Sequence, residues 1–254
     1  MTAGLWTRAS NYYKRNSARL LYKDTFVVRT STPLISFTFD DFPRSAFTVG
    51  AEILAECGAA GTYYVCLGLL GNDSPSGSLC TAEDLRALLA SGHELGCHTY
   101  SHCHSWDTRP EVFEESVLKN RAALETLIPT MKFESFSYPL AEPRPLTKRR
   151  TAPHFRCCRV GGQKFNAGKA DLAGLAAYFL EQSRGDLQAV KDMIDCNRAA
   201  RGWLIFATHD IADRPSRYGC TPEFFRAVVR YSVSSGAAIL PVTSALKLLQ
   251  GGSI

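Results

Sequence analysis

Long uninterrupted apolar runs are missing from this chain of 254 residues, although 45% of its residues are hydrophobic. Because a helix that crosses a bilayer needs about 20 consecutive apolar residues, we expect no transmembrane segment. A glycine-rich phosphate-binding turn is missing too: the first apolar segment, residues 34–39, runs into Asp40 and Asp41, whose charges would repel a phosphate. Internal repeats and low-complexity stretches are also absent. These absences favour one folded domain, residues 31–254.

An excess of charge is missing from most of the chain. The formal charge is +5, but residues 1–30 hold six basic side chains and one acidic, so the other 224 residues carry 23 of each sign. The neutral body argues against nucleic acid as a partner. The N-terminal segment, residues 1–30, lacks the apolar core of about 7–15 residues that an export signal needs, which favours the cytoplasm. Nine cysteines, an odd number, are then expected to be reduced thiols.

The basic N-terminal segment allows two interpretations. It is either a helix packed on or extending from the domain, or a weak peripheral contact with an anionic membrane surface through Trp6, Tyr12, Tyr13 and Leu20. The sequence does not encode the oligomeric state in any readable form.

Strand-like and helix-like segments alternate after residue 30. Apolar segments rich in aromatic and β-branched residues predict strands at residues 34–39, 62–67, 93–96, 133–138, 156–160, 203–208 and 237–242. Helices are predicted at 82–90 after Thr81, at 111–127, at 187–201 and after Thr221. Four glycines are expected to end helices: Gly58, Gly92, Gly202 and Gly236. The alternation predicts an α/β fold with about seven parallel strands, either open or closed into a barrel.

Polar side chains gather where three predicted strands end. Asp40 and Asp41 follow residues 34–39, His98 and His102 follow 93–96, and His209 follows 203–208. Because the carboxyl ends of parallel strands share one edge, these side chains should meet there. Two histidines four residues apart and a carboxylate make a three-ligand site with an open position, which is typical of a catalytic metal. One aspartate and one histidine remain as base and acid.

Three segments resemble the motifs of a known family. Residues 36–41 (SFTFDD), 98–102 (HTYSH) and 204–210 (LIFATHD) are similar to the first, second and last motifs of the polysaccharide deacetylases, carbohydrate esterase family 4, and occur in that family's order. The resemblance covers about residues 31–250. It implies a distorted (β/α) barrel of about seven parallel strands and a metal-dependent removal of acetyl groups from a saccharide.

The resemblance also implies roles for single residues. Asp41, His98 and His102 would bind a divalent metal, for which zinc is the default, and manganese, cobalt or nickel would also fit the ligands. Asp40 would be the general base and His209 the general acid. Neighbouring side chains of an extended segment diverge, so the two aspartates should not contact the ion symmetrically.

The third motif departs from the family's pattern. Many members carry an arginine there, whereas residues 136–142 read FSYPLAE and lack the glycine usual two places after the proline. Leu140 is expected to give the backbone N–H that holds the oxyanion. Arg159 is expected to take the arginine's place beside Asp40 and to keep it ionised. Asp171 is the candidate to orient His209.

Simpler interpretations stand beside these. Asp40 and Asp41 alone would be an acidic turn before a helix. Three histidines are interpreted as non-ligands: His93, His104 and His154. Cys97 and Cys103 flank the paired histidines and suggest a thiolate site, but a closed site of this kind would leave no position for water. The basic stretch, residues 144–169, which has no acidic residue, is either a solvated surface or the approach for an anionic substrate such as a phosphate-linked sugar.

The residues at the strand ends predict a metal-dependent hydrolase, and the resemblance implies that it removes an N-acetyl group from an acetylated amino sugar or glycan. The same residues would serve a non-carbohydrate amide or an O-acetyl ester. A catalytically impaired relative that binds a glycan is a further alternative, because the third motif is altered. Nothing in the sequence specifies the natural substrate or its length.

Overall fold

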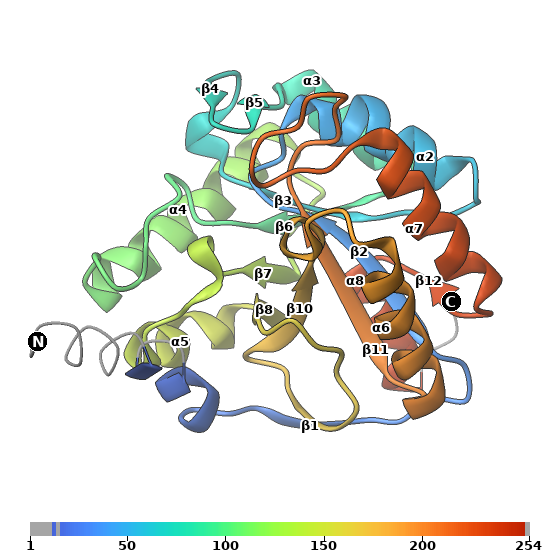
Figure 1. The fold of residues 1–254 in the computed structure, drawn as a ribbon. Coiled ribbons are helices and arrows are strands. Elements are labelled where there is room, and N and C mark those ends of the chain that lie inside the picture. The colour runs from blue at the N-terminus through green and yellow to red at the C-terminus, as the bar shows by residue number, and fades with distance from the viewer. Residues whose placement is uncertain (1–11, 14–15, 252–254) are drawn as a thin grey trace, which may run out of the picture.

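Seven parallel strands form a closed barrel at the centre of the molecule (Figure 1). The computed structural model describes residues 12–13 and 16–251. The ring consists, in spatial order, of β2 (Leu34–Phe39), β3 (Thr62–Val65), β6 (Glu94–Cys97), β7 (Ser135–Ser137), β8 (Cys157–Gly161), β10 (Leu175–Phe179) and β11 (Trp203–Thr208). It closes because β11 pairs with β2 along the whole of both strands. The predicted distorted (β/α) barrel is confirmed.

Helices and short strands make the connections around the barrel. The helices are α2 (Glu52–Ala55), α3 (Ala82–Ala90), α4 (Pro110–Leu127), α5 (Pro145–Thr151), α6 (Leu187–Ala200), α7 (Pro222–Ser234) and α8 (Val242–Leu249). The other strands are β1 (Thr25–Val28), β4 (Asp73–Ser74), β5 (Gly77–Ser78), β9 (Gly168–Asp171) and β12 (Ala238–Ile239). Thr81 and Asp84 cap α3 reciprocally, as a capping box does. Within the described residues, no helix has the length and apolar character that a membrane crossing requires.

Three expectations about these elements are wrong. Residues 237–242 give only β12, which pairs with the start of β2 outside the ring, before α8 begins at Val242. The seventh barrel strand is β10, which we did not predict because its leucine and alanines favour a helix at least as strongly. Gly202 does not end α6, since Arg201 takes the left-handed conformation at φ 49°.

Alternation along the strands decides which side chains enter the barrel. Successive residues of a strand face opposite sides, so the even-numbered residues 34–40 share one face. Leu34 packs there with Trp203 and other inward residues, and Ser36 accepts a hydrogen bond from the Trp203 indole at 3.0 Å. Asp40 continues this inward face at the carboxyl end of β2. The strand pattern thus delivers one carboxylate to the barrel interior.

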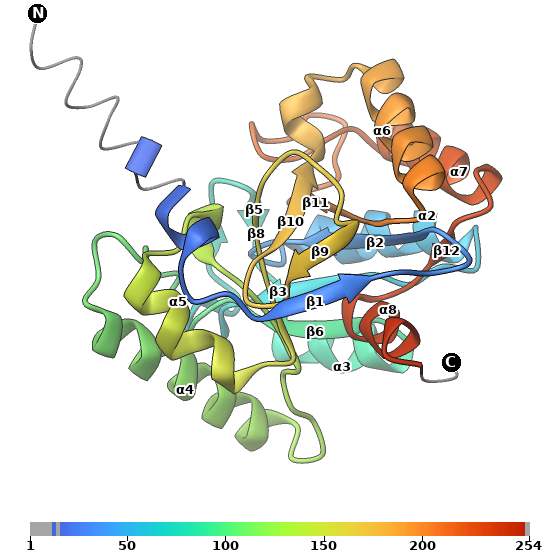
Figure 2. The ribbon, with the colours of Figure 1, turned by 90° about the horizontal axis from the view of Figure 1, so that it is seen from below.

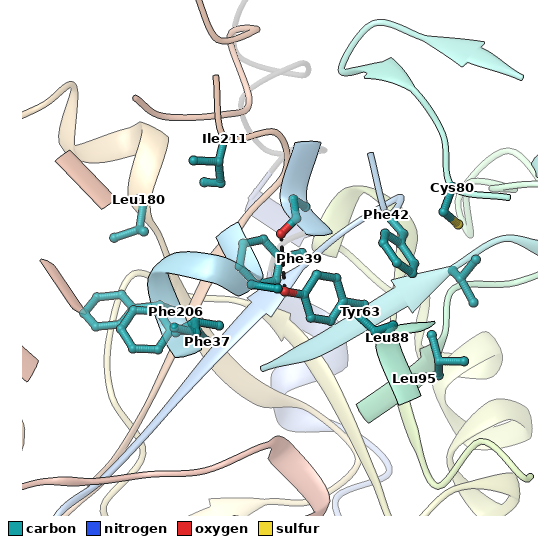
Figure 3. Packing of buried hydrophobic residues seen from close by; sticks show 14 of the residues in the cluster. Phe37, Phe39, Phe42, Tyr63, Cys80, Leu88, Leu95, Leu180, Phe206 and Ile211 are labelled. Carbon is teal, nitrogen blue, oxygen red and sulfur yellow. Dashed lines mark hydrogen bonds between the residues drawn. The ribbon is translucent and has the colours of Figure 1, made fainter. Parts of the chain in front are cut away.

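The odd-numbered residues of β2 pack outward beneath the helices. Phe37 stacks on Phe206 with ring centroids 5.4 Å apart, and Phe39 stacks on Tyr63 at 4.5 Å. The buried Tyr63 hydroxyl donates a hydrogen bond to the carbonyl of Ala46, at the start of the turn of π-helix Ala46–Ala51 (Figure 3). Each aromatic pair adds about 1 kcal/mol beyond its buried area. This layer fixes the connection that follows the two aspartates.

The described part of the N-terminal segment lies against the barrel. Residues 16–20 are helical, and β1 pairs antiparallel with β9 at the lower end of the barrel, which Figure 2 shows from below. The buried Lys148 ammonium of α5 donates hydrogen bonds to the carbonyls of Ala18 (2.7 Å) and Leu21 (3.1 Å) and pairs with Asp171. These contacts join the segment to α5 and to β9. Trp6 lies outside the described residues.

Replacing Lys148 by methionine should loosen this segment. The variant keeps the bulk of the side chain but leaves Asp171 without its cation, so we expect the free energy of unfolding to fall by about 3 kcal/mol. Amide hydrogen exchange should become faster in residues 16–28, and denaturant unfolding should give the change in stability. Lys164→Met, at an exposed position, is the control. Unchanged exchange in residues 16–28 would contradict the assigned role.

Candidate active site

The loops that follow the barrel strands meet at one end of the barrel. Six of the ten described non-glycine residues with a clearly positive φ lie in the loops after β2, β6 and β7: Asp41, Phe42, Thr99, His102, Leu140 and Ala141. A left-handed backbone costs a non-glycine residue about 1–2 kcal/mol, so the surrounding structure must impose it. Strain of this kind gathers at functional sites. The loops after β2, β6 and β7 are therefore candidates for the functional site.

Asp41, His98 and His102 form a cluster whose potential ligand atoms lie within 4.8 Å of one another. Asp41 Oδ1 is 3.5 Å from His98 Nε2 and 3.3 Å from His102 Nε2. This oxygen is buried and has no hydrogen-bond partner among the described residues. An orphaned acceptor that faces two imidazole nitrogens fits a cation bound by all three groups. Two imidazoles and one carboxylate are a donor set that a divalent metal could use.

His98 is held in the tautomer that a metal ligand needs. Its Nδ1 lies 2.7 Å from the Ser137 carbonyl, which can only accept, so Nδ1 carries the proton and Nε2 keeps its lone pair. Burial, opposed in part by the charge of Asp40, lowers the pKa of His98 to about 4. The ring is therefore neutral near pH 7 and available to a metal.

Asp40 is buried in the barrel and paired with Arg159. The guanidinium donates to Asp40 Oδ1 and to the Ser137 hydroxyl, and that hydroxyl lies 3.3 Å from the same carboxylate oxygen. Burial alone would raise the pKa of Asp40, but the charge of Arg159, with smaller effects from His98 and His209, lowers it to about 2. The stability that this depressed pKa contributes is present above pH 3.8, the unfolded value, and is lost as the pH falls through about 2.

Two aromatic rings hold the Arg159 guanidinium. Its Cζ lies 5.2 Å from the centre of the Tyr64 ring and 5.3 Å from that of the Phe179 ring. Such cation–π contacts stabilise a desolvated guanidinium by about 2 kcal/mol. A Cβ at Gly96 would lie 2.3 Å from the Tyr64 ring, so this position of β6 has no room for a side chain. Gly96 thereby gives space to the ring that positions the arginine.

His209 faces the cluster from the end of β11. Its Nε2 lies 3.9 Å from Asp41 Oδ2, and its Nδ1 lies 3.3 Å from the carbonyl of Tyr218. The Tyr218 ring packs on the imidazole with centroids 5.3 Å apart. Asp210 holds the intervening loop because its carboxylate accepts hydrogen bonds from the backbone N–H (2.7 Å) and the hydroxyl of Ser216. The loop after β11 therefore orients the histidine.

The structure does not bring Asp171 to His209, which corrects that prediction. The Asp171 carboxylate pairs with Lys148 and accepts hydrogen bonds from the backbone N–H groups of Asp24 (2.9 Å) and Ala173 (3.0 Å). Residue 171 ends β9, which lies beside the N-terminal segment rather than in the ring of strands. Asp171 therefore fixes that segment, and a backbone carbonyl takes the orienting position at the histidine.

A cleft of about 800 Å³ opens above these side chains. Leu140, 59% exposed and left-handed at φ 58°, forms part of its wall, and Arg19 of the N-terminal segment lies at another part. Glu181, which follows β10, also lines the cleft and was missed by sequence reasoning because β10 was not recognised as a strand. Ser137 and Tyr218 were missed because their backbone carbonyls, which any residue has, contact the histidines.

Most of the basic stretch, residues 144–169, turns away from the cleft. Of its eight basic side chains only Lys148 lines the cleft, and it pairs with Asp171. Arg150 and Arg156 pair with glutamates of other segments. The stretch therefore contributes mainly internal and surface ion pairs, which disfavours it as an approach for an anionic substrate.

The cysteines beside the histidines are not part of the ligand cluster. Among the described residues, the grouped ligand atoms come from one carboxylate and two imidazoles, with no thiol. Burial raises the pKa of Cys97 to about 12, so this thiol is neutral near pH 7. All nine cysteines of the chain are free. The closed thiolate site has no support in this geometry.

Comparison with known proteins bears on the same end of the barrel. Residues 28–152 match the sequence profile of the polysaccharide deacetylase family. The matched region includes both aspartates after β2, both histidines after β6, and Leu140. Among curated protein sequences, none matches the chain. The predicted resemblance is confirmed.

Solved structures share the fold over most of the chain. A family 4 acetyl xylan esterase from Clostridium thermocellum, in complex with a cobalt ion, is 22% identical and has a TM-score of 0.60, covering 87% of this chain and 93% of its own. The peptidoglycan deacetylase PdaC from Bacillus subtilis is 13% identical with a TM-score of 0.57, covering 88% and 95%. A mutant of BA3943, a pseudoenzyme of the same esterase family with restored activity, is 11% identical with a TM-score of 0.60, covering 86% and 69%. At these identities the likeness establishes the fold alone.

We expect the purified protein to bind one divalent metal at the cluster. His98→Ala should weaken zinc binding at least about 100-fold, because losing a ligand costs no less than losing a group that orients one. Elemental analysis after dialysis and a calorimetric zinc titration measure the effect. His104→Ala is the matched control, since that ring pairs with Asp107 outside the cluster. Stoichiometric zinc in the His98→Ala variant would rule out the site.

Proposed function

Because residues 28–152 belong to the polysaccharide deacetylase family, we propose that this chain is a metal-dependent hydrolase that removes an N-acetyl group from an acetylated amino sugar or glycan. One observation carries the proposal. The Asp41, His98 and His102 cluster lines the same cleft as an ionised carboxylate, Asp40, and an imidazole, His209. A hydrolytic metal site needs a base on one side of the reacting carbonyl and an acid on the other.

Each residue of the site has a separate role in the proposed hydrolysis. When bound, the metal would polarise a water molecule and the acetyl carbonyl. Arg159 and Ser137 occupy Asp40 Oδ1, so the other carboxylate oxygen is left to take the proton of the attacking water. The backbone N–H of Leu140 would stabilise the negative charge that develops on the carbonyl oxygen.

His209 would protonate the departing amine. Its Nδ1 faces the Tyr218 carbonyl, which fixes the proton of that nitrogen and leaves Nε2 to carry the transferable proton. Nε2 lies on the side of the Asp41, His98 and His102 cluster, 3.9 Å from Asp41 Oδ2. An acid so placed would reach the nitrogen of the amide whose carbonyl carbon the activated water attacks.

The ligand set and the cysteines support two finer statements. Two imidazoles and one carboxylate suit zinc, and manganese, cobalt or nickel would also fit them. Nine free cysteines, most of them buried, suit a reducing compartment, so we propose that the protein works in the cytoplasm.

A second candidate is a catalytically impaired glycan-binding relative. The altered third motif, residues 136–142, favours it, and one structural neighbour is a mutated pseudoenzyme of the same esterase family. The presence of Asp40 and His209 in one cleft, with Arg159 buried behind Asp40, favours an active enzyme. Hydrolysis of a non-carbohydrate amide or an O-acetyl ester would use the same groups.

Asp40→Asn tests the assigned base. The variant keeps the shape but cannot take a proton, so we expect kcat for acetate release to fall about 100- to 10,000-fold. Substrates are an acetylated chito-oligosaccharide and an aryl acetamide, each with and without a chelator. Asp192→Asn, on an exposed part of α6, is the matched control. Full metal-dependent activity in Asp40→Asn would refute the role, and a metal-loaded wild type inert on both substrates would favour the binding protein.

We also propose a weak contact between the N-terminal segment and an anionic membrane surface. Leu20 is 72% exposed, and Leu21 and Tyr22 beside it are also exposed. The exposed cations Arg19 and Lys23 flank them. An apolar group rimmed by cations suits the interface of an anionic bilayer.

Vesicle co-sedimentation measures this contact. Wild type should bind vesicles of phosphatidylglycerol and phosphatidylcholine, and binding should fall at least about tenfold on vesicles of phosphatidylcholine alone or in a Leu20→Glu, Leu21→Glu double variant. Val233→Glu changes an exposed apolar residue of α7 and is the control. Equal binding by the double variant and the wild type would exclude this surface as the contact.

A further inference from the structure

Glu181 is an ionisable group of the cleft that the reaction described above does not use. It lies in the 3-10 turn Leu180–Ser183, directly after the barrel strand β10, and lines the cleft together with Asp40 and His209. Its Oε2 atom is buried and has no hydrogen-bond partner among the described residues. A buried carboxyl oxygen without a partner is destabilising unless something else satisfies it. The cleft is the space from which such a partner would come.

The groups around Glu181 do not favour its charge. Asp40 at the end of β2 and Asp210 after β11 are anionic neighbours, and Arg159 of β8 is the nearby cation. Arg159 makes no ion pair with Glu181: its Nη2 donates to Asp40 and Ser137, and its Nε and Nη1 are buried without a hydrogen-bond partner among the described residues. The Cys220 thiol also faces this carboxyl and is neutral, since burial raises its pKa to about 12.

Protonation follows from these surroundings. Burial first, and then the charges of Asp40 and Asp210, raise the pKa of Glu181 to about 8, against the opposing effects of its own backbone N–H and of Arg159. Because the pKa is raised, the neutral form predominates below pH 8 and the charged form above it. A neutral carboxyl has an O–H donor that an ionised one lacks.

We propose that Glu181 is a neutral hydrogen-bond donor that binds a carbonyl or hydroxyl oxygen of the acetylated substrate in this cleft. This inference rests on the proposed function. The aspartates of the cleft floor are acceptors when ionised, whereas the oxygens of an acetylated sugar need donors as well. Ionisation of Glu181 removes the donor and places a third negative charge near Asp40 and Asp210. Substrate binding therefore weakens as the pH rises through the pKa of Glu181.

Two variants separate a donor from a structural side chain. Glu181→Gln keeps the shape and offers an N–H donor at every pH, so kcat/KM should stay within about threefold of wild type at pH 7, and KM should no longer rise above about pH 8. Glu181→Ala removes the donor, so KM for the chito-oligosaccharide should rise about tenfold or more at pH 7 with kcat less affected. Asp192→Asn should leave both constants and their pH dependence unchanged. Equal loss in the glutamine and alanine variants would overturn the proposal.

A direct titration needs no turnover. Infrared difference spectra of the metal-loaded protein should show a protonated carboxylic acid that disappears as the pH rises through about 8 and is missing from Glu181→Gln. Absence of that band at pH 6 would overturn the proposal even in an active enzyme. If the band is present but no substrate is hydrolysed, the proposed function fails separately. Calorimetric binding of the oligosaccharide at pH 6 and pH 9.5 then decides about the donor, and equal affinity at the two values would contradict it.

Discussion

The buried ion pair between Asp40 and Arg159 is the contact on which the rest of the site depends. Removing two charges from water costs several kcal/mol for each ion, and only good geometry and further hydrogen bonds compensate for it. Ser137 gives one further hydrogen bond, and the rings of Tyr64 and Phe179 flank the guanidinium, whose Nε and Nη1 have no hydrogen-bond partner among the described residues. The two ions come from strands 119 residues apart in the sequence. An ionised carboxylate at the end of β2 therefore requires the closed barrel.

Ser137 couples this ion pair to the ligand cluster. Its hydroxyl contacts Asp40 and Arg159, while its carbonyl accepts the proton of His98 Nδ1. A shift of β7 would consequently disturb the charge of the carboxylate and the tautomer of the histidine together. The altered third motif, residues 136–142, begins on this strand, yet the contacts that matter use a small hydroxyl and backbone atoms. In this chain the arginine beside Asp40 comes from β8 and not from that motif.

The sequence permitted prediction of what depends on residue type and strand order. The strand at residues 34–39 and the convergence of the two aspartates with His98 and His102 followed from apolar segments ending in polar side chains. The closure into a barrel followed from the family resemblance. Arg159 was found because a buried aspartate without the usual arginine needs another cation. The features that the sequence did not predict depend on tertiary structure. The Leu-Ala-Ala-Tyr-Phe segment of β10 lacks a clear strand pattern, so the sequence did not indicate that Glu181 follows a barrel strand. The carbonyl of Tyr218 could not be predicted either, because every residue has a backbone carbonyl.

The contacts of Lys148 also bear on the order in which the chain acquires structure. The buried ammonium and β9 hold residues 18–28, and the pairing joins residues as much as 147 positions apart, such as Asp24 and Asp171. Pairings this distant form late, because the loop between them must close first. During synthesis, the N-terminal segment therefore cannot pair with β9 until about two thirds of the chain has been made. One wall of the cleft is completed only then, after the strands that carry Asp41, His98 and His102 have been made.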